Sequence, residues 1–130
     1  IGSTLTFALP SSNYQDLVFA YETRRSGSGA NRQYLSYTID GTTFLPLDTL
    51  AVTEAPTLIT YNFTDSAGVN DNPAFAIAIQ IDQFDDGTGG TVGNNRFDNV
   101  TLDGVPLETA NFPPSVAFDP ALIELIAAGG

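Results

Sequence analysis

The sequence contains no cysteine, histidine, methionine or tryptophan, and arginine supplies all four of its cations. Without cysteine and histidine, the chain cannot form disulfides, thiol nucleophiles or catalytic triads that need histidine. Fifteen carboxylates give a net charge of −11, which opposes binding to nucleic-acid phosphates and to anionic membranes. No apolar run approaches the roughly 18 residues that a membrane span requires. We therefore expect no nucleic acid as a partner and no membrane insertion.

The remaining composition predicts one folded domain. The 130 residues are 42% apolar and only 15% charged, which is typical of a globular chain with its own core. The sequence starts at Ile1 without an initiator methionine, and we take this as a sign of processing and export. The high content of small polar residues and glycine is typical of extracellular proteins. We expect the protein to be secreted or displayed on a cell surface.

Apolar and polar residues alternate with a period of two along most of the chain, which predicts β-strands. The pattern indicates an all-β fold, an antiparallel β-sandwich of the jelly-roll-like kind. We assign the sandwich to residues 1–107 and a C-terminal extension to residues 108–130. The predicted strands are residues 3–9, 17–25, 33–39, 43–47, 57–64, 75–84 and 96–102, with a further one at 115–118.

Two local patterns within the sandwich lead to sharper predictions. The sixth run alternates Phe75, Ile77, Ile79 and Ile81 with small or polar residues, so we place it centrally and expect cover on both faces. Asp40-Gly41 separates two apolar runs and predicts a hairpin with a two-residue type I′ turn, which needs positive φ at both positions.

The C-terminal extension carries the signals of a short helix. Asp119 is a good N-cap, Pro120 suits the first turn, and a glycine pair follows the apolar stretch. This helix packs either on its own sandwich or on a neighbouring copy. If it packs on a neighbour, the chain forms a homo-polymer through its termini, and the uncharged first strand offers a second contact. The predicted assembly residues are Leu122, Ile123, Leu125, Ile126, Leu5 and Phe7.

Three segments resemble the galactose-binding-like and carbohydrate-binding-module jelly rolls of secreted bacterial surface proteins. They are Leu35-Ser-Tyr-Thr-Ile-Asp-Gly-Thr-Thr-Phe44, the preceding segment 17–29, and Asn95-Arg-Phe-Asp-Asn-Val-Thr-Leu-Asp-Gly104. The resemblance implies a β-jelly-roll fold, and it makes glycans expected partners. The chain departs from these modules in having no tryptophan for a sugar-binding platform.

Asp98 is a candidate metal ligand. Alternation places it on the same side of its strand as Val100 and Leu102, and an inward carboxylate needs a cation or several hydrogen-bond donors. The resemblance implies that this residue binds a structural Ca²⁺. The alternatives are a salt bridge to Arg96 or Arg32, or N–H donors from a turn.

A second acidic group lies in a glycine-rich segment. Asp82, Asp85 and Asp86 precede Gly-Thr-Gly-Gly, and calcium prefers six to eight oxygen ligands of the kind that such loops supply. The alternative is a solvated loop whose charges limit pairing between sheet edges. Ca²⁺ is thus the one cofactor that the sequence suggests.

The sequence leaves two function classes and gives no support for an enzyme. The first is a non-catalytic structural or adhesive protein, a self-assembling subunit of a surface filament or layer that calcium stabilises. The alternative is a carbohydrate-binding module of a secreted multidomain protein. In that alternative Tyr14 or Tyr34 binds the sugar, together with Asn and Asp residues of the end loops.

Overall fold

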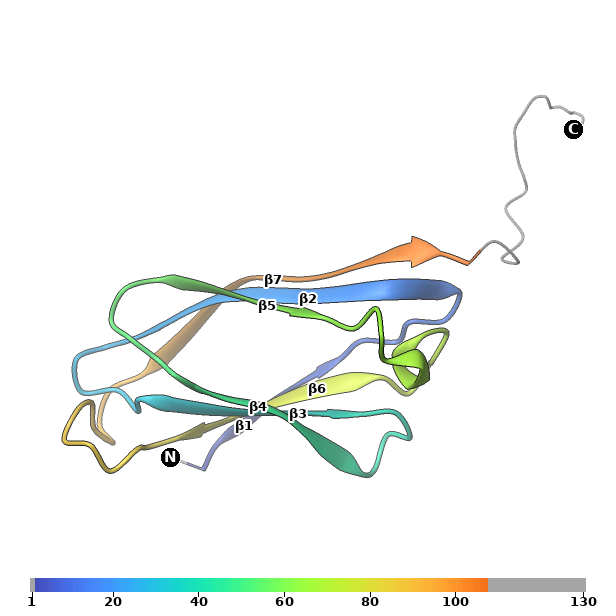
Figure 1. Ribbon diagram of the computed structural model, residues 1–130. Coiled ribbons are helices and arrows are strands. Elements are labelled where there is room, and N and C mark those ends of the chain that lie inside the picture. Colours follow the sequence, from blue (N-terminus) through green and yellow to red (C-terminus); the bar gives the residue numbers. More distant parts are fainter. Residues whose placement is uncertain (1, 108–130) are drawn as a thin grey trace, which may run out of the picture.

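Two antiparallel sheets face each other as a β-sandwich in the computed structural model, which describes residues 2–107 (Figure 1). One sheet has four strands, in the order β1 (Thr4–Ala8), β6 (Ala76–Asp82), β3 (Arg32–Thr38) and β4 (Phe44–Ala51). The other has three strands, in the order β5 (Thr57–Asn62), β2 (Tyr14–Arg25) and β7 (Asn95–Pro106). A short 3-10 helix, η1 (Ala67–Val69), lies between β5 and β6.

The sandwich confirms the predicted fold class and the seven strands predicted before residue 107. The chain crosses from one sheet to the other at every connection except the β3–β4 hairpin, as expected for a jelly-roll-like fold. The predicted strand at 115–118, the predicted helix and its residues Leu122, Ile123, Leu125 and Ile126 lie outside the described residues. No helix within residues 2–107 is long and apolar enough to cross a membrane.

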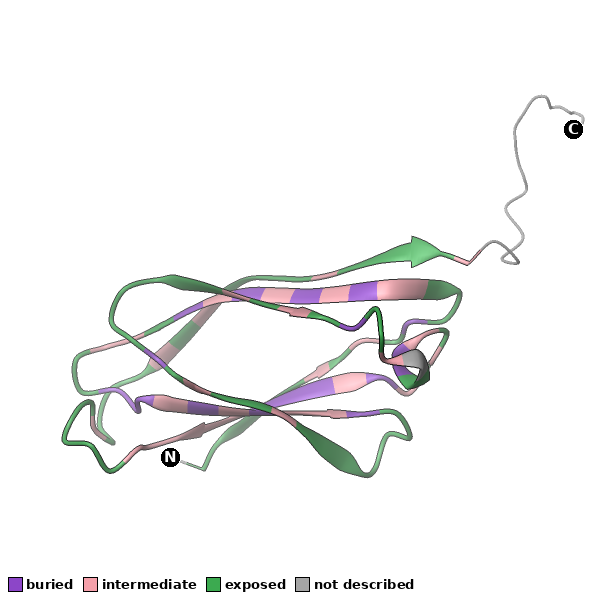
Figure 2. Ribbon diagram, viewed as in Figure 1, coloured by how far each residue is buried: buried purple, intermediate pink, exposed green. Residues whose placement is uncertain are grey.

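The core lies between the two sheets, and buried residues alternate with half-buried ones along β2 (Figure 2). Its buried members are Leu17, Phe19, Tyr21, Leu35, Phe63, Val69, Phe75, Ile77 and Ile79. Phe7 of β1 joins this core, with its ring centroid 6.0 Å from that of Phe19. The ring centroids of Phe19 and Tyr21 are 5.6 Å apart, and those of Phe63 and Phe75 are 5.4 Å apart. Two rows of aromatic rings therefore fill the space between the sheets.

A polar network crosses the apolar core. Gln33 of β3 has no solvent exposure. Its side-chain oxygen Oε1 accepts a hydrogen bond from the Tyr21 hydroxyl at 2.9 Å. The Gln33 amide nitrogen donates to Thr23 Oγ1 at 2.8 Å and to Asn95 Oδ1 at 2.9 Å. Burial, together with the nearby charge of Asp48, raises the pKa of Tyr21, so its hydroxyl stays protonated as a donor. This network connects β3 of one sheet with β2 and β7 of the other.

Strand β6 is central in its sheet, between β1 and β3, as predicted. The expected cover on both of its faces is wrong for the described residues. Ile77 and Ile79 are fully buried against the other sheet, but Gln80 and Asp82 on the opposite face are only half-buried. The small residues Ala76 and Ala78 on that face are shielded by neighbouring strands, and residues 2–107 form no third layer above them.

The Asp40-Gly41 hairpin is confirmed, but its turn is not a two-residue type I′ turn. Thr38 pairs with Phe44, which leaves a five-residue loop, and only Gly41 has a positive φ, of +85°. The Asp40 carboxylate accepts the N–H groups of Thr42 and Thr43 at 2.8 and 2.7 Å. These bonds and the Thr38 hydroxyl hold the pKa of Asp40 well below its usual range. The side chain of Asp40 thus organises a longer loop by bonding to backbone N–H groups.

Replacing Gly41 by valine should lower the free energy of unfolding by about 1–3 kcal/mol, because a β-branched residue is strained at positive φ. A Cβ atom at this position meets only Ala74 at 3.8 Å, so the cost comes from the backbone and not from a clash. Urea denaturation of Gly41→Val measures it, with Thr42→Val in the same loop as the control. Equal stability of both variants would contradict the assigned loop conformation.

Two glycine-rich loops pack against each other at one end of the sandwich. They are residues 26–31 and 83–95, joined by backbone bonds from Gly90 N to Gly29 O at 3.0 Å and from Gly93 N to Ser28 O at 2.9 Å. A Cβ atom on Gly93 would lie 2.6 Å from the Gly29 nitrogen, so only glycine permits this approach. Binding residues often lie in or beside such end loops. These two loops lead into β3 at Arg32 and into β7 at Asn95, next to residues of the two sheet faces described below.

Candidate functional site

The outer face of the four-stranded sheet presents a polar row around Tyr34. Because Leu35 and Ile79 point into the core, their neighbours Tyr34 and Gln80 point to the opposite face. Tyr34 lies directly opposite Gln80 of β6 and Thr49 of β4, and Gln80 lies opposite Thr4 of β1. One row of an aromatic ring, an amide and two hydroxyls therefore crosses all four strands.

The residues on either side of this row differ in character. On one side, Arg32 lies opposite Asp82 and forms an ion pair with it, and the guanidinium sits 5.1 Å from the centre of the Phe84 ring. The bond from Arg32 lowers the pKa of Asp82, which therefore stays ionised as an acceptor. On the other side, Ser36 lies opposite Ala78. Both side chains are small, so they protrude little from the sheet beside Tyr34.

A hollow of about 370 Å³ lies beside Tyr14. Tyr14 begins β2 and is 45% exposed. The hollow is lined by Pro10, Ser11, Tyr14, Leu17, Leu102, Asp103 and Gly104. Tyr14 and Tyr34, which the sequence offered as alternatives, lie on different sheets, so the structure does not bring them into one site.

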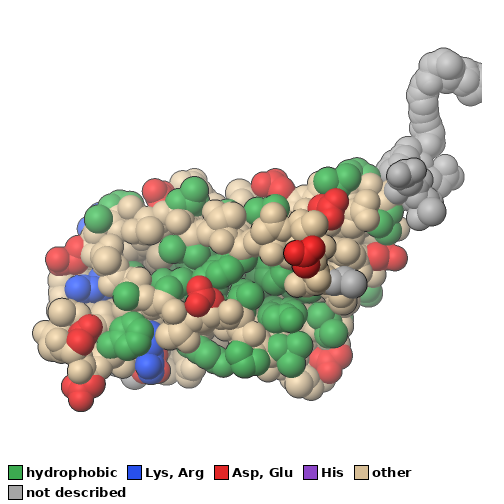
Figure 3. Space-filling model, in the orientation of Figure 1, with side chains coloured by type: hydrophobic (Ala, Val, Ile, Leu, Met, Phe, Trp, Pro, Cys, Tyr) green, Lys and Arg blue, Asp and Glu red, His purple; other side chains and the backbone are tan. Residues whose placement is uncertain are grey.

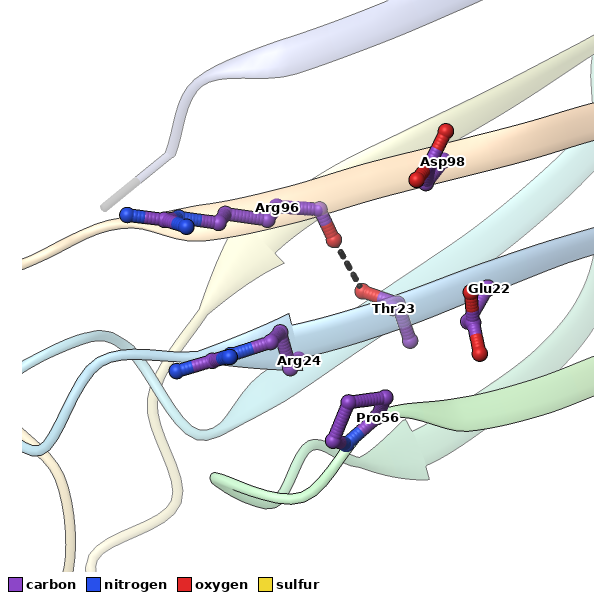
Figure 4. Close-up of a pocket in the computed structure, with 6 residues that line it drawn as sticks. All are labelled: Glu22, Thr23, Arg24, Pro56, Arg96 and Asp98. Carbon is purple, nitrogen blue, oxygen red and sulfur yellow. Dashed lines mark hydrogen bonds between the residues drawn. The ribbon is translucent and has the colours of Figure 1, made fainter.

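Another hollow, of about 240 Å³, lies on the outer face of the three-stranded sheet (Figure 4). It is lined by Glu22, Thr23, Arg24, Pro56, Arg96 and Asp98. On the side of the molecule that Figure 3 shows, the basic groups are confined to one end, while acidic groups are spread widely. This hollow combines two arginines and two carboxylates on adjacent strands, β2 and β7.

The expected inward orientation of Asp98 is wrong, because the side chain is exposed on the outer face. Asp98 lies opposite Glu22 and Thr101 lies opposite Ala20, so β7 has one more residue than β2 between these pairs. Asn99, with φ of +51°, belongs to this β-bulge. The extra residue reverses the alternation, so Phe97 and Leu102 both contact the core although five positions separate them.

The acidic loop is tied down by side-chain bonds. Asp82 is bound to Arg32, and Asp86 Oδ1 accepts bonds from Asn31 Nδ2 at 2.9 Å and from the Thr88 hydroxyl at 2.7 Å. Asp85 is exposed. Within residues 2–107, no three carboxylates come close enough together to hold a metal ion. Calcium binding by Asp82, Asp85, Asp86 or Asp98 stays a prediction, best tested by the melting temperature in Ca²⁺ and in chelator.

The two assembly residues of the first strand have different surroundings. Phe7 packs inside the sandwich against Phe19, whereas Leu5 is 40% exposed. β1 pairs with β6 along one edge, so this strand is already part of its own domain. The predicted contact between copies through the termini stays a prediction.

Sequence reasoning offered Tyr34 or Tyr14 as the sugar-binding residue, but it did not align Gln80 and the Arg32–Asp82 pair with Tyr34. Alternation already places Gln80 and Asp82 on the face opposite Ile79, which is the signal that could have found them. Their alignment with Tyr34 depends on the register between β3 and β6. β3 ends at Thr38 and β6 begins at Ala76, so 37 residues lie between the two strands. Such a distant register is not visible in a local pattern.

Comparison with known proteins agrees with this architecture. No protein-family model and no curated protein matches the sequence. The chain is similar to the N-terminal cellulose-binding domain of Cellulomonas fimi beta-1,4-glucanase C, with a TM-score of 0.52 and 18% identity over 80% of this chain and 70% of that chain. A structure described as CBM4 has a TM-score of 0.48 and 21% identity over 78% of this chain and 72% of that chain. The first likeness confirms the expected fold, an antiparallel β-sandwich of the jelly-roll-like kind.

Proposed function

We propose that this chain is a non-catalytic carbohydrate-binding module of a secreted protein, and that it binds glycans on the outer face of its four-stranded sheet. The observation that carries the proposal is the row of Tyr34, Gln80, Thr4 and Thr49 across that face, with the Arg32–Asp82 pair beside it. The sandwich fold shared with a cellulose-binding domain supports the same function.

The chemistry of this face suits a neutral sugar. A sugar ring has apolar C–H faces and hydroxyl groups that both donate and accept hydrogen bonds. Tyr34 supplies a flat amphipathic ring, and Gln80 supplies one acceptor and two donors. Asp82 and Arg32 add charged groups whose hydrogen bonds to hydroxyls are stronger than those of neutral groups. Because the row crosses all four strands, it suits an extended chain of several sugar units.

The same face argues against glycoside hydrolysis. Hydrolysis of this kind uses two carboxylates that flank the scissile bond at a defined separation, one of which must become a proton donor. Asp82 lies beside the Tyr34 row, and its pKa is lowered by Arg32, so it is a poor acid. The chain also contains no histidine that could act in its place. Binding without turnover is therefore the better-supported function.

Replacing Tyr34 by alanine should weaken glycan binding at least tenfold, because the aromatic contact at the centre of the row is lost. Array screening identifies the glycan, and isothermal titration with it, starting from cello-oligosaccharides, measures the change. Tyr34→Phe should keep most of the affinity, since the ring remains.

The matched control is Tyr14→Ala, which removes the other candidate tyrosine on the other sheet. It should leave the affinity unchanged. If Tyr14→Ala abolishes binding and Tyr34→Ala does not, the glycan binds in the hollow beside Tyr14. If the folded chain binds no glycan on the array, the proposed function is wrong.

A further inference from the structure

Two arginines lie directly opposite each other on the outer face of the three-stranded sheet. Arg24 of β2 pairs in register with Arg96 of β7, and both side chains are exposed. Figure 4 shows them extending side by side in the same direction. A guanidinium is always charged in a protein, and like charges directly opposite in a sheet are destabilising. Within residues 2–107, neither group has an ion-pair partner.

The other two arginines are bonded to the protein. Arg32 is paired with Asp82. Arg25 donates from Nε to the Val52 carbonyl at 2.9 Å and from Nη1 to the carbonyls of Ser26 and Gly27 at 3.2 and 3.1 Å. A chain with a net charge of −11 has many carboxylates available as partners. The unpaired placement of the Arg24–Arg96 pair therefore stands out against the rest of the molecule.

Two carboxylates lie next to these arginines on the same strands. Glu22 of β2 is directly opposite Asp98 of β7, one outward position away from Arg24 and Arg96. Asn99 Nδ2 donates to Glu22 Oε1 at 3.3 Å, and the Thr23 hydroxyl donates to the Arg96 carbonyl at 2.9 Å, which ties β2 to β7 beneath the hollow. Together with Pro56, these side chains line the hollow of about 240 Å³. The hollow is thus bipolar, with two cations at one end and two anions at the other.

This charge pattern limits the ligands that fit. A simple anion satisfies the arginines but is repelled by the two carboxylates beside them. A neutral sugar can donate hydrogen bonds from its hydroxyls to Glu22 and Asp98, but it leaves the arginines without an ion-pair partner. A sugar with a ring carboxylate satisfies both ends, because its carboxylate accepts from the guanidiniums and its hydroxyls donate to the carboxylates.

We propose that the hollow between Arg24, Arg96, Glu22 and Asp98 is a second binding site, specific for a uronic acid residue of a glycan. It extends the proposed function to the other sheet but uses none of the residues around Tyr34. The arginines donate hydrogen bonds to the sugar carboxylate, and Glu22 and Asp98 accept hydrogen bonds from the sugar hydroxyls. The repulsion between the two arginines in the free protein is relieved when the sugar carboxylate lies between them.

The test compares three probes on the full chain by NMR titration in physiological salt: glucuronate, glucose and acetate. We expect glucuronate to bind at least tenfold more tightly than either glucose or acetate, and to shift the amide signals of β2 and β7. Arg24→Gln combined with Arg96→Gln should remove glucuronate binding. Glu22→Gln combined with Asp98→Asn should weaken glucuronate binding while leaving acetate binding equal or tighter.

A stability measurement separates a binding role from a structural one. The Arg24→Gln, Arg96→Gln variant should melt at the same temperature as the parent or higher, since it loses only a repulsive pair. Thr42→Val, in the loop between β3 and β4, serves as the control that leaves glucuronate binding intact. Failure of the Tyr34 site alone thus removes the neutral-glycan proposal, and failure of glucuronate binding alone removes this one.

Three results would overturn the inference. Equal affinity for acetate and glucuronate would mean a site for anions only. Absence of glucuronate binding in a correctly folded chain would exclude the site. A dimer in sedimentation that dissociates in the arginine variant would mean that the bipolar face pairs with a second copy of this chain, because a two-fold axis brings each arginine pair onto the carboxylates of the other copy.

Discussion

Replacing the buried Gln33 by alanine should lower the free energy of unfolding by about 3–5 kcal/mol. The side chain has no solvent exposure and makes three hydrogen bonds, one from Tyr21 and two to Thr23 and Asn95. Its removal leaves a cavity between the sheets and an unpaired Tyr21 hydroxyl in the core. Urea denaturation followed by tyrosine fluorescence measures the change.

The matched control is Gln80→Ala on the neighbouring strand. Gln80 lies on the outer face, so its loss should change the stability by only about 0.5 kcal/mol. Gln33→Leu separates the two causes, since it fills most of the volume but makes no hydrogen bonds. A Gln33→Leu variant as stable as the parent would show that the polar network does not stabilise the fold.

Replacing Asn31 by alanine should lower the free energy of unfolding by about 2–4 kcal/mol. Asn31 is 3% exposed, directly precedes β3, and holds the loop that contains Asp86. Its Nδ2 donates to Asp86 at 2.9 Å and to the Thr88 hydroxyl at 2.8 Å, and its Oδ1 accepts the Phe84 N–H at 2.6 Å. The variant removes these bonds, one of them to a charged carboxylate, and leaves the half-buried Phe84 N–H without its acceptor. Thermal and urea denaturation should agree on the loss.

Asn94→Ala is the control for this variant, because Asn94 is exposed and bonds to Ser26 only through its backbone. A second readout comes from Asp86. The Thr88 N–H and hydroxyl, and then the Asn31 amide, hold the pKa of Asp86 below its usual range. In Asn31→Ala an NMR titration should find this pKa raised. An unchanged pKa would mean that Asn31 does not hold the loop.

The strands could be predicted from the sequence because each one carries its pattern locally. In β2, Leu17, Phe19 and Tyr21 alternate with outward residues, and all three are buried as expected. Burial of one face sets the alternation, and the alternation is visible over five or six residues. The end loops were equally visible, since glycine, asparagine and aspartate gather there.

The orientation of Asp98 could not be predicted in the same way. A β-bulge depends on how β7 aligns with β2, and one extra residue reverses every side chain beyond it. The sequence does contain a hint, because Asn99 is a residue type that tolerates positive φ better than most. The turn at Asp40 illustrates the same limit, since the bonds from its carboxylate compete with the turn type that Asp-Gly favours.

For the candidate site, the sequence offered Tyr14 and Tyr34 as alternatives but did not show what surrounds either one. Whether Tyr34 binds sugar stays a prediction, but the structure places it on the outer face of its sheet. Its alignment with Gln80 arises from pairing between distant strands, and the hollow at Arg24 and Arg96 arises from the pairing of β2 with β7. Local periodicity gives the face of a residue, whereas the neighbours on that face come from the tertiary register.

The order of strands also determines how this chain can fold during synthesis. Within residues 2–107, only the β3–β4 hairpin joins strands that are neighbours in a sheet. β1 and one edge of β3 stay unpaired until β6 has left the ribosome, and β2 lacks one neighbour until β7 follows. Such non-local pairing predicts refolding in milliseconds to seconds. During that time the net charge of −11 keeps nascent chains apart and so protects their open strand edges from aggregation.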